Sequence, residues 1–257
     1  MRVKAQASVL AKAQASIETY FEVEELLGIK PEFKMPACNS TVVESYEDVE
    51  LMADRLRNEW DLGEGPIENL MEVLEANGIK VAVVQADSAF DALMVETDAG
   101  LPVIVVRDGL PGDRQRFSLA HELGHAIVRH VDSLDPEKVA NRFAGALLVP
   151  ASSVRSELGA SRQRLDIQEL CLLKQRYGLS IAAWAYRAKD LGIITDAYFA
   201  SFNRFLRVKG LHREEEYCSM DSELAFRRVR LVQRAIAEGL VSRTKAEELR
   251  DVALQQR

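Results

Sequence analysis

The stretch RFSLAHELGHAIVRH, residues 116–130, places two histidines four positions apart, with a glutamate directly after the first. An α-helix turns by about 100° per residue, so His121 and His125 lie about 40° apart on one face of the helix. Two imidazoles in this arrangement can bind one metal ion, and Glu122 lies to one side, where it can reach a bound water. The stretch carries the HExxH motif of zinc peptidases and predicts a metal site on a helix.

A chance match is the alternative explanation for this motif. Only four histidines occur in the chain, and an accidental HExxH is expected in roughly one per cent of chains of this length and ordinary composition. A purely structural histidine pair would also leave Glu122 without an evident task. We therefore interpret the motif as a metal site.

A third protein ligand is needed, because catalytic zinc normally takes three and keeps one position open. His130 is the nearest candidate, but on a continuous helix it lies about 140° from His125 and about 180° from His121. We expect His130 to be a residue at the C-terminal end of the helix, where the helix dipole favours positive charge. The third ligand must then come from a later segment.

The segment DPEKVANRFAGALLVP, residues 135–150, predicts a second helix, with Asp135 as its N-cap and a proline in the first position. Glu137 and Asn141 share one face of this helix, so Glu137 could complete a His-His-Glu set, with Asn141 in support. A glutamate is also favoured in a first turn by the helix dipole alone, so Asp132 and Asp135 stay open as alternative ligands. Zinc is the default metal for this set, although manganese and iron accept the same ligand types.

Upstream of the motif the hydrophobic pattern changes from helical to alternating. Helices are predicted over residues 1–28, from Ser45 with Asp48 as capping partner, and from Pro66 to Asn77. Runs rich in β-branched residues then predict three strands, at 79–85, 90–97 and 101–108. Asp113 is the expected cap of the motif helix. The run LPVIVV, residues 101–106, is a candidate edge strand that could align an extended substrate.

Downstream of Pro150 the sequence predicts helices only. Gly178 is expected to end one helix, Ser180 to begin the next, and either Thr195 or Asp196 to begin the one after it, while a final pair covers about 221–255. The chain is therefore predicted to be α+β, with a small three-stranded sheet packed on helices and helical extensions at both ends.

The composition excludes several classes of protein. The net charge is −7, which gives no sign of a nucleic-acid footprint, and no apolar run is long enough to cross a membrane. The three cysteines, Cys38, Cys171 and Cys218, are far apart in sequence and form no CxxC pair, so reduced thiols are expected. We expect a soluble, cytoplasmic protein.

The two motifs together resemble the ImmA/IrrE metallopeptidases, which are bacterial and phage regulatory proteases. RQRFSLAHELGHAIVRH and EKVANRFAGALLVP carry the resemblance, and flanking segments extend it to about residues 45–200. It implies a minimal zincin-like fold with a three-stranded sheet beside the HExxH helix. It also implies His121, His125 and Glu137 as zinc ligands, with Glu122 as the general base.

The resemblance also implies a biological role and a division of the chain. Many relatives cleave a helix-turn-helix repressor of a mobile element or stress response, and others lie beside toxins as apparent antitoxins. The expected division is an N-terminal helix and linker at 1–40, a zincin-like metallopeptidase domain at 41–200 and a C-terminal helical extension at 201–257. Longer members often begin with a helix-turn-helix domain, for which the first 40 residues are too short, so we do not expect direct DNA binding.

Two other functions remain open at this point. LKQRYGLSIAAWAYRAKDLG, residues 173–192, has the form of a helix-turn-helix, with Arg187 and Lys189 late in its second helix. The first residues of this second helix, Ser180 to Ala183, are small or apolar, which disfavours contacts with DNA bases. A basic helix near the C-terminus, carrying Arg227, Arg228, Arg230 and Arg234, could meet an acidic partner or nucleic acid. The first of the two functions is therefore binding to DNA or an acidic partner. The second is that of an antitoxin-like protein, which binds a partner without cleaving it.

Peptide hydrolysis also needs a donor for the oxyanion. The sequence offers Tyr177, Tyr186, Arg187 and His212 in the expected half of the chain and does not choose among them.

Overall fold

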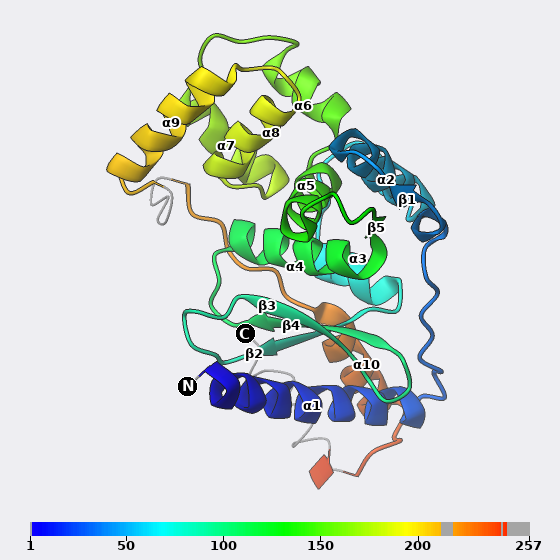
Figure 1. Ribbon diagram of the computed structural model, residues 1–257. Coiled ribbons are helices and arrows are strands. Elements are labelled where there is room, and N and C mark those ends of the chain that lie inside the picture. The colour runs from blue at the N-terminus through cyan, green and yellow to red at the C-terminus, as the bar shows by residue number, and fades with distance from the viewer. Residues whose placement is uncertain (1, 212–217, 243, 246–257) are drawn as a thin grey trace. The chain divides into compact units, whose positions relative to one another are not determined.

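The computed structural model of the protein describes residues 2–211, 218–242 and 244–245 and divides into two compact units (Figure 1). Unit 1 comprises Met1–Lys34, Asn69–Leu110 and Glu223–Arg257, and unit 2 comprises Met35–Glu68 and Pro111–Ser222. The chain is α+β, as predicted. No helix among the described residues combines the length and the apolar character that crossing a bilayer requires.

Unit 1 is built on a mixed three-stranded sheet of order β2-β4-β3. β2 (Lys80–Val84) runs parallel to β4 (Pro102–Arg107), and β3 (Ala92–Glu96) runs antiparallel to it. The three predicted strands are all present. However, β4 is the central strand and is paired on both sides, so the prediction that LPVIVV forms a free edge is wrong.

Helices cover one face of this sheet. Figure 1 shows α1 (Arg2–Leu26) running beneath the strands, and its buried residues Val9, Ala13 and Ile17 recur one turn apart. They pack on side chains that alternate along β2 and β4: Ala82, Val84, Val103 and Val105. This packing joins a helix-period pattern to a strand-period pattern in one apolar core.

The third helix begins later than the sequence predicted. α3 (Leu70–Ala76) starts after Asn69, whose side-chain oxygen accepts a hydrogen bond from the backbone N–H of Glu72 at 3.0 Å. Asn69 therefore caps the helix, and Pro66 lies in the preceding loop rather than in the first position of the helix.

The basic helix near the C-terminus is α10 (Phe226–Ala237), and it packs against α1. Arg230 pairs with Glu72 at 2.6 Å, and buried Arg228 donates to Ser16 at 2.8 Å. These arginines are thus engaged inside unit 1. The second helix of the predicted C-terminal pair falls mostly on residues 246–257, which lie outside the described part of the chain.

Unit 1 also buries a group of ionisable side chains. Lys80 pairs with Glu24 at 2.5 Å and lies over the ring of Tyr20, 4.0 Å from its centroid. Glu75 is only 2% exposed, and burial raises the pKa of its carboxyl to about 7.

Unit 2 is mostly helical. Its helices are α2 (Tyr46–Glu59), α4 (Gly112–Ile127), α5 (Pro136–Leu148), α6 (Ala151–Leu158), α7 (Ile167–Tyr177), α8 (Ile181–Asp190) and α9 (Asp196–Val208), with a 3₁₀ turn, η1 (Ala37–Ser40). Side chains of Ser45, Asp135, Ser180 and Thr195 cap α2, α5, α8 and α9 as predicted.

The motif helix differs from the prediction at both ends. α4 begins at Gly112 after Pro111, and Asp113 does not cap it but forms a buried ion pair with Lys174 at 3.2 Å. α4 ends at Ile127, so His130 is not helical. It belongs instead to β5 (Arg129–His130), which pairs in parallel with β1 (Val42–Val43). Strand pairing with a segment far away in sequence overrides the helical pattern here.

A buried ionic network joins α2, α5 and α8. Glu50 of α2 accepts a bidentate contact from Arg187 of α8, with 2.9 Å between Nη2 and Oε2, and a further contact from Arg142 of α5. Arg142 also pairs with Asp190 at 3.0 Å. Because Arg187 is 2% exposed and Trp184 is fully buried, the helix-turn-helix-like segment is packed as part of the core.

Two of the cysteines meet despite their separation in sequence. Sγ of Cys171 in α7 lies 2.6 Å from Sγ of Cys218. This proximity follows from the tertiary fold alone.

Candidate metal centre

The site is formed where α4 and α5 cross, and glycine makes the crossing close. A Cβ added to Gly124 would lie 3.0 Å from Cδ1 of Phe143 and 3.3 Å from Cα of Ala140. Both distances are shorter than ordinary van der Waals contact, so any side chain at this point would require its neighbours to move by a few tenths of an ångström. The close approach places the first turn of α5 beside the histidine face of α4.

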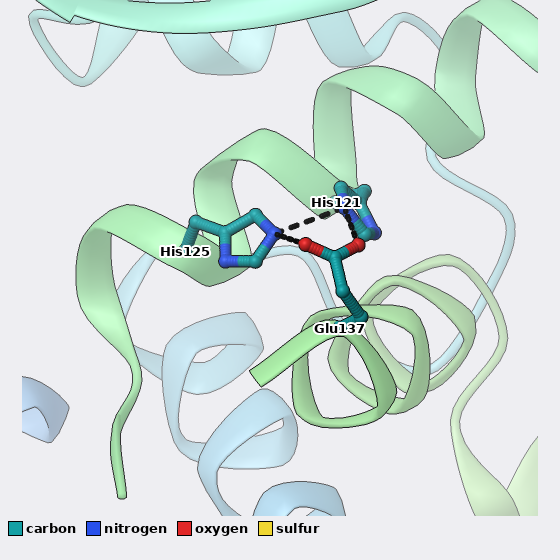
Figure 2. A group of neighbouring side chains, drawn as sticks. All are labelled: His121, His125 and Glu137. Atoms are coloured by element: carbon teal, nitrogen blue, oxygen red, sulfur yellow. Dashed lines mark hydrogen bonds and ion pairs between the residues drawn. The ribbon is translucent and has the colours of Figure 1, made fainter. Parts of the chain in front are cut away.

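The two histidines and Glu137 converge in space. Figure 2 shows the three side chains pointing toward one another, the imidazoles from α4 and the carboxylate from the start of α5. Nε2 of His121 lies 3.4 Å from one carboxylate oxygen of Glu137, and Nε2 of His125 lies 3.3 Å from the other. The two Nε2 atoms are 3.0 Å apart.

These separations match those of three ligands around one metal ion. Zinc sites are tetrahedral with ligand atoms about 2.0–2.1 Å from the metal, which places neighbouring ligand atoms about 3.3–3.4 Å apart. Among the described residues, this is the one group of three histidine, cysteine or acidic side chains with ligand atoms within 4.8 Å of one another. The donor set, two imidazoles and a carboxylate, also fits zinc.

Asn141 orients the first of the two histidines. Its side-chain oxygen lies 3.0 Å from Nδ1 of His121. An amide oxygen only accepts, so in the neutral imidazole the proton lies on Nδ1 and the lone pair on Nε2, the atom that faces Glu137. Such support fixes the tautomer that metal binding requires.

The group is open to solvent on one side. The exposed fractions of the side chains are 17% for His121, 32% for His125 and 70% for Glu137. Glu122 follows His121 on α4 and is half-buried. A substrate can therefore approach these residues without a large rearrangement.

The structure separates Glu137 from the alternatives that the sequence left open. Asp135 accepts hydrogen bonds from the backbone N–H groups of Glu137 and Lys138, at 3.0 and 3.3 Å, and so acts as the helix cap. Asp132 and His130 are not part of the converging group.

Three of the four candidate oxyanion donors are not placed at this group. Tyr177 donates a hydrogen bond to Glu157 at 2.9 Å, Arg187 is bound to Glu50, and His212 lies outside the described residues.

A pocket borders the converging group within unit 2. It has a volume of about 1180 Å³, and its lining includes Asn141, which contacts His121, and Phe117, whose ring centroid is 6.4 Å from that of His121. Tyr186, the remaining candidate donor, also lines it. The sequence did not reveal this pocket, because helices far apart in sequence form its walls. The recurrence of Lys138, Asn141 and Gly145 on one face of α5 is a local signal of it.

The comparisons with known proteins agree with the geometry. Residues 75–189 match the model of the family described as Peptidase_M78, IrrE N-terminal-like domain. No match was found among the curated proteins.

Among the solved structures, a Mycobacterium tuberculosis transcriptional regulator is similar at 20% identity with a TM-score of 0.41. The similarity covers 66% of this chain and 51% of that chain, so the present chain spans about half of its length. The HELGH motif and the ANRFAGALLVP region both lie inside residues 75–189, the segment that matches this family model.

Proposed function

We propose that the protein is a zinc-dependent, site-specific endopeptidase that cleaves a partner protein in the cytoplasm. One observation carries the proposal: the Nε2 atoms of His121 and His125 lie 3.0 Å apart, and each lies 3.3–3.4 Å from one oxygen of the Glu137 carboxylate, separations close to those of neighbouring ligand atoms around zinc. The family match supports a peptidase of a regulatory kind.

Each residue of the group has a distinct role in this proposal. His121 and His125 bind zinc through Nε2, Glu137 binds it through its carboxylate, and Asn141 holds His121 in the required tautomer. A zinc ion held there supplies Lewis acidity and lowers the pKa of a water molecule to about 7. Glu122 accepts the proton of the attacking water and passes it to the leaving amine.

The substrate class follows from the family resemblance. We propose a helix-turn-helix repressor as the protein that is cleaved, with a cognate toxin as the alternative partner. The division of the chain at residues 40 and 200 stays a prediction.

The first test is metal content, measured by mass spectrometry on purified protein. Wild type should bind close to one zinc ion, and His125→Ala and Glu137→Ala should each lose it, because two ligands bind zinc far more weakly than three. His130→Ala is the matched control, since this nearby histidine lies in β5 and outside the converging group. It should retain zinc.

The second test separates cleavage from binding. Candidate repressors encoded beside the protein are incubated with zinc-loaded wild type and with Glu122→Gln, which keeps the ligands and removes the base. Cleavage by wild type alone supports the endopeptidase. A wild type that binds no zinc when zinc is abundant contradicts the proposal, and zinc with tight partner binding but no cleavage replaces it with an antitoxin-like function.

A further inference from the structure

Helices α4, α5 and α8 supply most of the residues that line the pocket beside the metal centre. On each of these helices the lining residues recur every three or four positions. They are Asp113, Arg114 and Phe117 on α4, Lys138, Asn141, Arg142 and Gly145 on α5, and Ala182, Ala183, Tyr186, Lys189 and Asp190 on α8. One helix face therefore points into it from each wall. Its volume, about 1180 Å³, exceeds that of most small-molecule sites and is sufficient for several residues of a polypeptide.

The lining is basic, although the chain as a whole is acidic. Six basic and two acidic side chains line the pocket, whereas the net charge of the chain is −7. The basic side chains are Arg114, Lys138, Arg142, Lys174, Arg187 and Lys189. A concave surface of one sign concentrates ligands of the opposite sign.

Some of this positive charge is neutralised by internal partners. Arg142 and Arg187 share Glu50, and Lys174 is paired with Asp113. Two lysines are engaged differently. Lys138 is exposed and forms no ion pair with any described residue. Lys189 is half-buried, and its Nζ lies 3.6 Å from Oδ1 of Asp190 and 5.4 Å from the ring centroid of Phe199.

Lys138 also lies next to the proposed metal ligand. It follows Glu137 directly on α5, and Asn141, one turn further along, both lines the pocket and contacts His121. A chain that enters the pocket along α5 therefore passes Lys138 within one turn of the metal centre. Phe117 and Tyr186 add aromatic surface to the same pocket, against which the apolar parts of a peptide can pack.

Resting on the proposed endopeptidase function, we infer that this pocket binds an acidic segment of the substrate polypeptide next to the bond to be cleaved. Lys138 and Lys189 bind its carboxylates, and Phe117 and Tyr186 contact its apolar atoms. The concave shape and the mixed lining favour a peptide over nucleic acid, whose backbone is contacted by rows of exposed cations. The pocket thereby selects substrates by charge.

Direct binding of peptides tests this inference without any turnover. The protein is the zinc-loaded full chain carrying Glu122→Gln. The probes are three fluorescein-labelled peptides with the same alanine and leucine flanks and with Glu-Glu, Gln-Gln or Lys-Lys at the centre. Anisotropy at low ionic strength should show that the Glu-Glu peptide binds about tenfold more tightly than the Gln-Gln peptide, as one charge-assisted hydrogen bond predicts.

Charge reversal in the pocket supplies the control. Adding Lys138→Glu should abolish the preference for Glu-Glu and strengthen binding of the Lys-Lys peptide. Lys209→Glu makes the same change at an exposed lysine after α9, outside the pocket, and should leave the order unchanged. Circular dichroism checks that both variants are folded.

The outcomes distinguish this inference from the proposed function. Equal binding of the Glu-Glu and Gln-Gln peptides, or binding of neither, overturns the inference even if wild type holds zinc and cleaves a protein. In a competition experiment, oligothymidylate and the unlabelled Glu-Glu peptide are each used to displace the labelled peptide. If oligothymidylate does so at the lower concentration, the inference is overturned, because the pocket then prefers nucleic acid. A Lys138-dependent preference together with absent cleavage would support acidic recognition and contradict the endopeptidase instead.

Discussion

Replacing Gly124 by alanine tests whether the close crossing of α4 and α5 creates the metal centre. In an isolated helix, alanine is favoured over glycine by about 0.8–1.0 kcal/mol. In this protein the added Cβ would lie 3.0 Å from Phe143, whose side chain is fully buried, and 3.3 Å from the backbone of Ala140. Neither neighbour is the free end of a flexible side chain, so α5 itself must move by a few tenths of an ångström.

Overpacking of this kind costs about 1–3 kcal/mol in a well-packed core. Set against the gain in helix propensity, the expected net loss is up to about 2 kcal/mol in the free energy of unfolding. The displacement also moves Glu137, which precedes Ala140 by one turn on α5. Zinc affinity should fall by about tenfold, since metal sites tolerate ligand displacements of only ~0.2 Å.

Two measurements check this prediction. Urea unfolding of the zinc-free protein gives the loss of stability, and competition with a chromophoric chelator gives the zinc affinity. Gly65→Ala is the control, because no described atom lies within 4 Å of its added Cβ and its backbone is not in the left-handed region. If Gly124→Ala unfolds at the same urea concentration as wild type or higher, and binds zinc equally well, the crossing does not set the site geometry.

Two further predictions follow from single contacts. Asn141→Ala should weaken zinc binding by about 10–100-fold, because His121 loses the acceptor that fixes its tautomer; Asn141→Asp keeps an acceptor and should bind close to the wild-type level in the same chelator competition. Glu75→Gln should stabilise the protein at pH 8 but not at pH 5, by up to about 3 kcal/mol. Burial raises the pKa of Glu75 from 4.5 to about 7, so the folded protein favours the neutral carboxyl. The stability that comes from the neutral form is full below pH 4.5 and is lost as the pH rises through 7. Urea midpoints of both proteins from pH 5 to 8 measure this difference, and a constant difference across that range would contradict it.

The features that the sequence predicted well depend on residues a few positions apart. The capping box of Ser45 and Asp48, the cap at Asp135 and the histidine face of α4 each need only one helical turn. Their geometry is fixed by the period of the helix and by the backbone donors at its start. That is why the histidine pair could be named before the fold was known, whereas the choice of Glu137 over Asp132 and Asp135 depends on the crossing of α4 and α5.

The features that it did not predict depend on pairing between distant segments. The helical pattern continues to His130, but β1, almost ninety residues earlier, pairs with this segment and ends α4 at Ile127. The strand runs were found individually, whereas the central position of β4 depends on which strands pair. The contact of Glu50 with Arg187, 137 positions apart, has no periodic signature at all.

The converging side chains are themselves an argument for a cation. With the Nδ1 proton of His121 bound to Asn141, its Nε2 presents a lone pair to a carboxylate oxygen of Glu137 at 3.4 Å. Two acceptors facing each other repel, and no feature of helix packing requires Glu137 to turn toward the histidines, since its side chain is 70% exposed. A divalent cation turns this repulsion into two attractive contacts.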